Sequence, residues 1–389
     1  MKVAVTGIGL ISDVGRGIVA HANALRASDT RLAPLTAFSP GDLPALPVGQ
    51  VAKADLDGDL HLGACEQLTL SAVRDALGGR APSGEGVFCL GTTTGGIPES
   101  EQHFLSKKAD EPLPSRDLLR HHPLGAVADR VAQRLGFFGE RHTFSTACSS
   151  SANAIGFAAM AIEGGAPWAI AGGVDALCRL TYAGFQSLRL LSPFPCRPFD
   201  ATRKGLCLGE AAAFLFMESL SSAKASGREV LGYVSGWGLS ADAYHATAPH
   251  PQGLGAIAAM KLALLDAGVS PGEIGYINAH GTGTEANDRV EALALRTVFG
   301  DTTPWVSSTK GLTGHTLGAA GALEAGLSLL SMREGYVPST LGFSSADAAM
   351  ALNQVPRGGT KASVAHVLST SFGFGGNNAA LVLSKADAS

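Results

Sequence analysis

Short runs of apolar, β-branched and small residues recur along the chain, and stretches with helical spacing separate them. Runs of this kind are typical of buried strands, and their alternation with helices predicts layered sheets and helices, an α/β fold. Residues 28–60, rich in Pro, Asp and Leu without a clear period, should lie outside this pattern. The predicted strands are KVAVTGIG (2–9), GVFCLG (86–91), WAIAGG (168–173), AAAFLFME (211–218), EVLGYVSG (229–236), IGYINA (274–279), SVAHVLS (363–369) and AALVLS (379–384).

The chain also resembles itself, because three segments of its first part recur in the same order in its second part. A repeat of this kind indicates architecture before any motif does. We predict two similar α/β halves, 1–220 and 228–389, around a pseudo-twofold axis, with a site between them that draws residues from both. The matched pairs are GTTTGGIPESE (91–101) with GTGTEANDRVE (281–291), SANAIGFAAMAIE (151–163) with LTGHTLGAAGALE (312–324), and AAAFLFMES (211–219) with AALVLSKAD (379–387).

Composition narrows the class of protein. Of the 389 residues, 46% are hydrophobic and only 16% are charged, which argues against disorder. A formal net charge of -4 gives no basic field for nucleic acid or anionic lipid. The six cysteines form no CxxC pair, and no run approaches the roughly 20 apolar residues of a membrane span. We expect a cytoplasmic protein without disulfides, signal peptide or membrane span.

One cysteine stands out by its context. Cys148 lies in FSTACSSSANAIGFAAMAIEGG (144–165), where small residues lead from a strand-like run into a buried helix. A thiol at a helix N-terminus gains an anion-stabilising field, which lowers its pKa by about one unit. Because that leaves mostly neutral thiol at pH 7, a partner such as histidine is needed.

The second half supplies such partners. INAHGTGTEAND (277–288) places His280 after a strand, and SSTKGLTGHTLGAAGALEAG (307–326) places Lys310 and His315 in the loop that opens the counterpart of the cysteine helix. From the internal repeat, we predict that these two loops and Cys148 converge on one pocket.

These residues are similar to a known family, the elongating β-ketoacyl-acyl-carrier-protein synthases, condensing enzymes with the thiolase fold. The resemblance implies two duplicated halves in a layered αβαβα arrangement, and its Cys-His-His set differs from that of initiating synthases, where asparagine replaces one histidine. The motifs that carry it span most of the chain: STACSSS (145–151), RPFDATRKGLCLGEAAA (197–213), DAYHATAPHPQG (242–253), NAHGTGTEAND (278–288), STKGLTGHTLGAAGALEA (308–325) and STSFGFGGNNAAL (369–381).

The resemblance implies a two-step reaction. Cys148 would take an acyl group from a carrier-protein thioester, and malonyl-carrier protein would then decarboxylate and attack the acyl-enzyme. His280 and His315 would donate hydrogen bonds to the developing negative charge, with backbone N–H groups of Cys148 and Phe374 as an oxyanion hole. Lys310 and Glu324 match the family's buried ion pair. No metal or organic cofactor is implied, since the substrates arrive on the phosphopantetheine arm of acyl carrier protein.

Further residues match by position. The resemblance assigns Thr282, Thr284 and Phe372 to the pantetheine arm, Phe374 to a gating role and Thr94 to the depth of the acyl pocket. Asp288 and Glu291 resemble loop anchors. Arg203 and Lys204 are candidates for contact with an acidic carrier protein, as are Lys107 and Lys108. Lys204 and Leu206 stand where Asp and Phe are usual in the family.

Three alternatives compete with this interpretation. A non-catalytic chain-length factor would lack the nucleophile, and a coenzyme A-dependent thiolase would need a cysteine in the C-terminal half, whereas the last is Cys207. A dinucleotide-binding oxidoreductase is suggested only by GIGLIS (7–12), where Ser12 replaces the third glycine. The sequence leaves open whether the pathway is fatty-acid or polyketide and polyene synthesis. We expect a homodimer, with a heterodimer containing a homologous subunit as the alternative.

Overall fold

The computed structural model describes residues 2–26, 29–59, 61–80, 85–109, 116–137 and 139–386. Its helices are α1 (Gly17–Ala24), α2 (Ala64–Leu77), α3 (Ile97–Lys108), α4 (Leu124–Leu135), α5 (Ser150–Glu163), α6 (Arg179–Ser187), α7 (Leu220–Ser226), α8 (Leu254–Ala267), α9 (Glu285–Phe299), α10 (Lys310–Thr313) and α11 (Ala320–Glu334). Short 3-10 turns that matter below are η3 (Ala147–Ser149), η5 (Leu317–Ala319) and η6 (Phe374–Gly376).

The strands of the main sheet follow the eight predicted runs, with three additions, β2, β6 and β11. They are β1 (Val3–Ser12), β2 (Gly15–Arg16), β5 (Val87–Gly91), β6 (Glu140–Phe144), β7 (Trp168–Asp175), β8 (Ala211–Glu218), β9 (Gly232–Ala241), β10 (Ile274–Asn278), β11 (Trp305–Ser307), β14 (His366–Gly373) and β15 (Asn377–Ser384). Two separate two-stranded ladders pair β3 (Ala33–Pro34) with β4 (Pro47–Val48) and β12 (Tyr336–Val337) with β13 (Thr360–Lys361). The first ladder lies in the region expected to depart from the main pattern.

The strand order is symmetric about the centre of the sheet. It runs β11-β10-β14-β15-β9-β1-β8-β7-β5-β6, with the parallel pairs at both outer ends and the antiparallel pairs in the middle. The two series meet at β1 and β9, whose ladder joins only Val3–Val5 to 232–234. This order is that of two similar five-stranded units, while the division at 220 and 228 stays a prediction.

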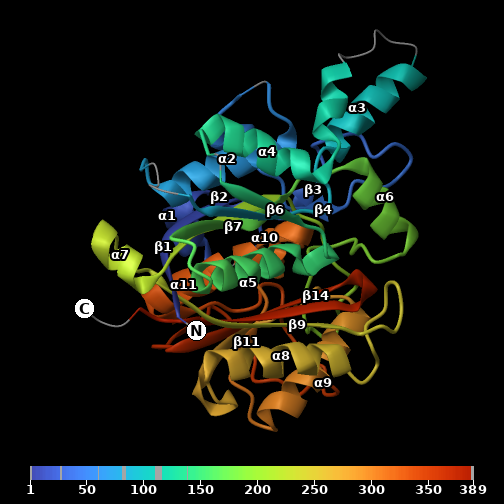
Figure 1. The fold of residues 1–389 in the computed structure, drawn as a ribbon. Helices are drawn as coiled ribbons and strands as arrows, with labels where there is room; N and C mark the ends of the chain where they lie inside the picture. The colour runs from blue at the N-terminus through green and yellow to red at the C-terminus, as the bar shows by residue number, and fades with distance from the viewer. Residues whose placement is uncertain are drawn as a thin grey trace.

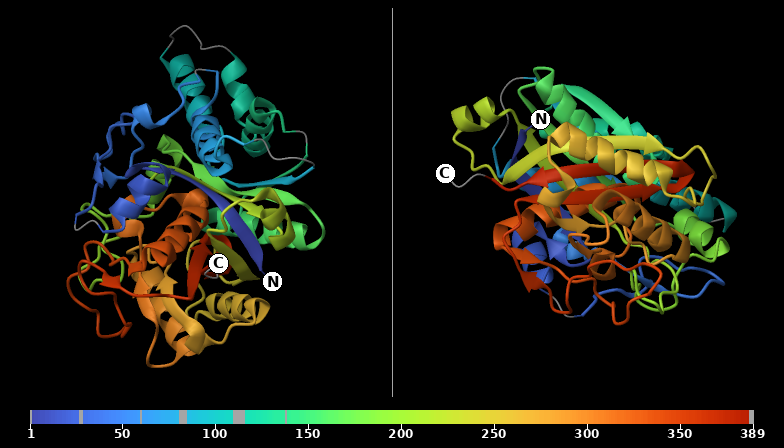
Figure 2. Two further views of the ribbon diagram at one scale, coloured as in Figure 1. Left: turned by 90° about the vertical axis from the view of Figure 1, so that its left-hand side faces the viewer. Right: turned by 90° about the horizontal axis from the view of Figure 1, so that it is seen from below.

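Helices and strands stack in five layers. In Figure 1, α2 and α4 cover one outer face, α5 and α11 lie in the middle between the strand layers, and α8 and α9 cover the other outer face. The views at right angles agree, and the view from below shows α8 and α9 across the strands near β9 (Figure 2). The predicted layered αβαβα architecture is confirmed. Among the residues that the structure describes, no helix combines the length and apolar character needed to cross a membrane.

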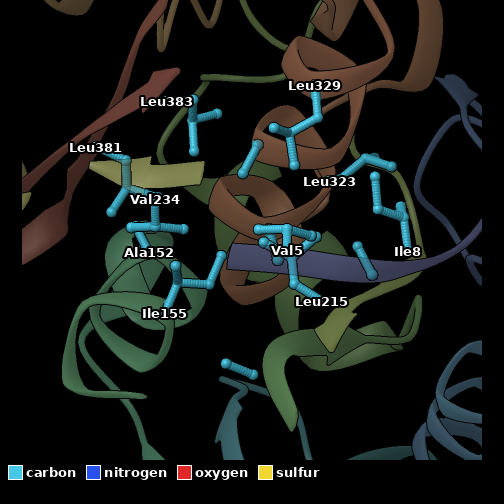
Figure 3. Close-up of a cluster of buried hydrophobic side chains, with 14 of the residues drawn as sticks. Val5, Ile8, Ala152, Ile155, Leu215, Val234, Leu323, Leu329, Leu381 and Leu383 are labelled. Carbon is cyan, nitrogen blue, oxygen red and sulfur yellow. The ribbon is translucent and has the colours of Figure 1, made fainter. Parts of the chain in front are cut away.

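The largest hydrophobic cluster fills the space around the two middle helices. Side chains from strands of both halves meet those of α5 and α11 there, as Figure 3 shows for Val5, Ile155, Leu215, Leu323 and Leu381. The side chains of α11 are buried without interruption from Ala320 to Met332. The two halves therefore share one core, and the ends of the middle helices lie deep inside the protein.

The two halves contain matching helices and turns, but the sequence alignment predicted between their middle helices is shifted along the chain. Helices α5 and α11 begin at Ser150 and Ala320, and the turns before them carry matching positive φ angles, 52° at Ala147 and 51° at Leu317. The counterpart of Cys148 is therefore Gly318. The predicted match of 151–163 with 312–324 is wrong in register, because alanine- and glycine-rich segments align almost equally well at several offsets.

Candidate active site

Cys148 sits at the turn between a strand and a buried helix, as predicted. Strand β6 ends at Phe144, η3 carries the cysteine, and α5 follows at once. The positive φ of Ala147 is rare for a residue with a side chain and turns the backbone sharply just before the thiol. Cys148 is only 7% exposed. The sequence therefore places the sulfur at the N-terminal end of a helix that the core holds rigidly.

The thiol is not acidified as the helix position alone suggested. Burial raises the pKa of Cys148 to about 12, while the nearby Lys310 ammonium and the backbone N–H of Phe374 act in the opposite direction. The predicted lowering of the pKa is wrong for the free protein, because desolvation of a thiolate outweighs the field of one helix terminus. The resting group is a neutral thiol.

His315 provides the partner that the thiol requires. It follows α10, and its Nε2 lies 3.0 Å from Sγ of Cys148. Its backbone N–H donates to the carbonyl oxygen of Cys207 at 2.7 Å, which fixes the loop. Burial, assisted by the charge of Lys310, holds the pKa of His315 well below its usual value, so the ring is neutral.

His280 lies beside this pair. Its backbone N–H donates to Oε1 of Glu291 at 2.8 Å and to Oγ1 of Thr370 at 2.9 Å, so a buried carboxylate anchors the loop after β10. The rings of His280 and His315 are 5.2 Å apart and nearly perpendicular. Burial also lowers the pKa of His280 well below its usual value. The predicted convergence of two neutral imidazoles with the cysteine is present.

Lys310 and Glu324 form the ion pair behind the histidines. Both side chains are almost fully buried, and Nζ of Lys310 donates to Oε1 of Glu324. Nζ also lies 3.3 Å from Nδ1 of His280. Burial raises the pKa of Glu324 to about 7, against the lowering effect of Lys310. The lysine thus connects the carboxylate to the imidazole.

Cys148, His280 and His315 are residue types that bind metal ions, but the positive charge beside them disfavours a bound cation. Ligand atoms of Cys148, His280 and His315 all lie within 4.8 Å of one another. Two imidazoles and a thiolate are common zinc ligands. Lys310, however, adds a positive charge against His280 in the same buried space, and an ion would meet that charge at low dielectric. The residues fit proton and hydrogen-bond chemistry better than a resident metal.

Phe374 approaches the cysteine from the second half. Its backbone N–H points at Cys148 Sγ, and its ring stacks on Phe185 with centroids 5.6 Å apart. The next two residues, Gly375 and Gly376, have φ angles of 76° and 74°. A Cβ at Gly376 would come within 2.5 Å of Cβ of Asp242, so the turn requires glycine.

A cavity of about 490 Å³ opens onto the cluster and is lined from both halves. Nine of the residues singled out from the sequence line it: Cys148, Arg203, Lys204, His280, Thr282, Thr284, His315, Phe372 and Phe374. Lys310 and Glu324 lie behind the cavity wall. Sequence reasoning missed Phe185, Arg189, Asp242 and Asn378, which also line the cavity. Asp242 and Asn378 fall within the quoted motifs 242–253 and 369–381, whereas Phe185 and Arg189 lie in no quoted motif.

The predicted pantetheine residues Thr282 and Thr284 lie in the loop before α9, and the predicted anchors Asp288 and Glu291 lie in the first two turns of α9. Thr282 and Thr284 share a hydrogen bond of 2.9 Å between their hydroxyls at the cavity wall. Asp288 accepts from the backbone N–H groups of Phe199 and Gly283, at 2.7 and 3.1 Å. The loop-anchor interpretation of Asp288 agrees with these contacts, as it does for Glu291.

Thr94 lies away from the cavity that opens onto Cys148, and its expected role in the acyl pocket stays a prediction. It is fully buried, and its hydroxyl donates to Oδ1 of Asp175 at 2.8 Å. Asp175 also accepts from the backbone N–H of Gly318 at 2.6 Å, so this carboxylate ties the loop after β5 to the turn that precedes α11. Thr94 does not line the cavity, and its hydroxyl is used in this structural network.

The two basic candidates differ in exposure. The Arg203 side chain is 5% exposed and contacts carboxylates of Asp288 at 3.8 Å and Asp347 at 3.1 Å. It is thus a buried structural group, which does not suit contact with a carrier protein. Lys204 is exposed at the rim of the cavity.

Comparison with known proteins agrees with this geometry. The family models described as "Beta-ketoacyl synthase, N-terminal domain" and "Beta-ketoacyl synthase, C-terminal domain" match residues 73–223 and 231–344. A 3-oxoacyl-[acyl-carrier-protein] synthase 2 from Synechocystis sp. is 35% identical over 414 aligned residues, covering 99% of this chain and 98% of the relative.

Comparison with solved structures also finds ketosynthases. A chain of the ishigamide ketosynthase/chain length factor superposes with a TM-score of 0.94 at 33% identity, covering 99% of each chain. A chain from the complex of a ketosynthase with its chain length factor from Xenorhabdus doucetiae superposes with a TM-score of 0.88 at 35% identity, covering 99% of this chain and 98% of that one. The chain belongs to the β-ketoacyl synthase family.

Proposed function

We propose that the protein is a β-ketoacyl-acyl-carrier-protein synthase that joins an acyl group held on Cys148 to a malonyl unit with loss of carbon dioxide. The observation that carries the proposal is the meeting of Cys148 Sγ with two neutral imidazoles at the end of a cavity lined from both halves. The presence of the nucleophile argues against a non-catalytic chain-length factor.

In the first step, sulfur of Cys148 attacks the thioester carbonyl of an acyl-carrier protein. A carbon–sulfur bond forms to Cys148, the bond to the pantetheine sulfur breaks, and the thiol proton leaves on the pantetheine thiol. His315 Nε2, at 3.0 Å from the sulfur, is placed to pass that proton on. The N–H of Phe374 would stabilise the oxyanion.

In the second step, the carbon–carboxylate bond of the malonyl thioester breaks and its electron pair forms an enolate. Lys310 donates to Nδ1 of His280, which leaves the proton of the neutral ring on Nε2 as a donor to the enolate oxygen. The enolate carbon then attacks the acyl carbonyl, the bond to Cys148 breaks, and the thiolate takes up one proton. No metal or organic cofactor is needed for either step.

We propose acyl carrier protein as the substrate-bearing partner and a homodimer as the assembly. The Synechocystis relative is named as a 3-oxoacyl-[acyl-carrier-protein] synthase, and the Xenorhabdus structure pairs a ketosynthase with its chain length factor. Strand β6 pairs with β5 on one side and, among the strands that the structure describes, has no neighbour on the other. Light scattering on the protein expressed alone should give a dimer, whereas a monomer would favour a heterodimer.

The six free, buried cysteines suit the reducing cytoplasm.

Acyl loading tests the function. The purified protein and its Cys148→Ala variant are incubated with acyl carrier proteins that bear saturated or unsaturated chains of different length, and intact mass is measured. The wild type should gain the acyl mass and the variant should not. The preferred chain would distinguish fatty-acid from polyketide or polyene synthesis. Equal loading of both proteins, or none from any donor, would contradict the proposal.

A further inference from the structure

Two of the six cysteines lie side by side in the interior of the protein. The thiols of Cys196 and Cys207 interact directly, and each sulfur also lies against the backbone N–H of the other residue. Both residues are at most 2% exposed and form a small buried cluster with Leu32. A disulfide requires Cα atoms within about 7 Å and side chains that point toward each other. Two cysteines whose sulfurs each reach the other's main chain meet both conditions.

The pair contacts both ends of the turn that carries Lys310 and His315. Sγ of Cys196 donates to the backbone oxygen of Lys310 at 3.2 Å. The backbone oxygen of Cys207 accepts from the N–H of His315 at 2.7 Å. Nε2 of His315 in turn lies 3.0 Å from Sγ of Cys148. A movement of the main chain at either cysteine is therefore passed on to the imidazole beside the nucleophile.

The pair also borders the active-site cavity. A bond between Cys196 and Cys207 would close a ring around residues 197–206. The last four of these residues line the cavity that opens onto Cys148: Arg203, Lys204, Gly205 and Leu206. A change in the state of the two thiols therefore acts on the cavity wall as well as on the turn behind it.

We propose that Cys196 and Cys207 are a redox-sensitive pair, which hydrogen peroxide converts to a disulfide that slows the chemistry of Cys148 by displacing the Lys310–His315 turn. One sulfur attacks a peroxide oxygen, the O–O bond breaks, and water leaves with the thiol proton. The second sulfur then attacks the resulting sulfenic acid, an S–S bond forms, and a second water leaves with the other thiol proton. Two thiols and one peroxide thus give one disulfide and two water molecules; the sulfurs are oxidised and the peroxide is reduced.

Burial and bond geometry explain the oxidant and the effect. Both thiols are almost inaccessible, so the oxidant must be small, and hydrogen peroxide is far smaller than glutathione disulfide. The sulfurs of a disulfide are about 2.05 Å apart, closer than two thiols in contact, so the main chain must move at one cysteine or both. Oxidation also removes the S–H groups that donate to the backbone oxygens of Lys310 and Phe194. The formation of the disulfide is independent of the proposed function, and only its effect on condensation rests on that function.

Peptide mapping tests the disulfide. The wild type is treated with hydrogen peroxide, the peroxide is removed with catalase, and the remaining thiols are blocked with iodoacetamide in denaturant. A peptide pair that joins Cys196 to Cys207 should appear, and dithiothreitol should separate it. Met160, which is 47% exposed, is converted to its sulfoxide in the same sample and shows that the oxidant acted. Full recovery of both cysteines as blocked thiols, with Met160 oxidised, would overturn the proposal.

The alkylation rate of Cys148 in the folded protein tests the effect on the site. It is measured before peroxide, after peroxide and after dithiothreitol in the wild type, in Cys207→Ala and in the control Cys89→Ala, which removes another buried thiol. Direct oxidation of Cys148 affects all three proteins alike, so the disulfide should lower the rate at least about fivefold further in the wild type and the control than in Cys207→Ala. Dithiothreitol should restore the rate.

An equal change of the alkylation rate in all three proteins would overturn the coupling between the disulfide and Cys148. Neither mapping nor alkylation uses an acyl substrate, whereas the condensing activity is tested by acyl loading of the untreated protein. Failure of the redox pair and failure of the proposed function are therefore distinguishable.

Discussion

At the scale of single residues, the site is governed by burial. Cys148, His280, His315, Lys310 and Glu324 are all almost inaccessible to solvent, so each charge must be compensated by a neighbour. The contexts of Cys148, His280, Lys310 and His315 in the sequence led to their predicted convergence, whereas Glu324 was added only by the family resemblance. The sequence could not give their pKa values, because desolvation depends on residues far away in the chain.

The Lys310–Glu324 pair leads to a stability prediction. Lys310→Met leaves a buried carboxylate without its partner, and removal of one member of such a pair destabilises by about 3–5 kcal/mol. Adding Glu324→Gln should restore much of the loss. Urea unfolding of the two variants and of the exposed-site control Lys107→Met measures this, and a double variant no more stable than Lys310→Met would contradict it.

The raised pKa of Cys148 gives a kinetic prediction. Because the folded thiol ionises at about pH 12, the rate of its alkylation by iodoacetamide in the free protein should keep rising with pH from 7 to 10. Peptide mapping of the modified cysteine measures the rate. A plateau below pH 8 would show that His315 and the helix terminus overcome the burial.

Asp13, directly after β1, is another carboxyl group whose oxygens are buried. Its two oxygens have no hydrogen-bond partner within the described part of the chain, and burial raises its pKa to about 7. The folded pKa exceeds the ordinary value of 3.8, so the stability contribution is complete below about pH 4 and is lost progressively as pH rises from there to about 7. Asp13→Asn should therefore raise Tm by roughly 2–6 °C at pH 8.5 and change it much less at pH 4.

At the scale of elements, the contact between α5 and α11 sets the geometry of the site. A Cβ on Gly321 would stand 2.8 Å from Cβ of Ala152, so the two helices approach as closely as glycine allows. Gly321→Ala should destabilise by about 1–3 kcal/mol through overpacking. Gly184→Ala on α6, where no atom lies within 4 Å, is the matched control and should stabilise by about 0.5–1 kcal/mol. Denaturant titration of the Gly321→Ala and Gly184→Ala variants measures these two changes in the free energy of unfolding.

The elements that sequence patterns predicted are those with long apolar runs. All eight predicted strands are present, whereas β2 and β11 were missed and β6 was predicted only as a short strand-like run before Cys148. Strand β6 carries Glu140, Arg141 and His142 and is partly exposed, and β11 has three residues, so neither shows a buried-strand pattern. The predicted alignment of α5 with α11 was wrong for a different reason, because segments made of small residues align almost equally well at several offsets.

At the scale of the whole molecule, the shared core predicts cooperative unfolding. One hydrophobic cluster contains residues of β1, α5 and β8 from the first half and of β9, α11 and β15 from the second. Neither half can bury its middle helix alone. Calorimetry should show one transition, and two well-separated transitions would contradict this interpretation.

The duplication has a consequence for how many sites one chain can offer. Gly318 stands where symmetry would place a second nucleophile, but its N–H binds Asp175, and a Cβ there would meet that carboxylate at 2.8 Å and the backbone of Thr92 at 3.1 Å. The turn before α11, which is the second copy, therefore has a structural role and carries no nucleophile. A chain built by doubling performs its chemistry only once, and its catalytic stoichiometry is one acyl group per polypeptide.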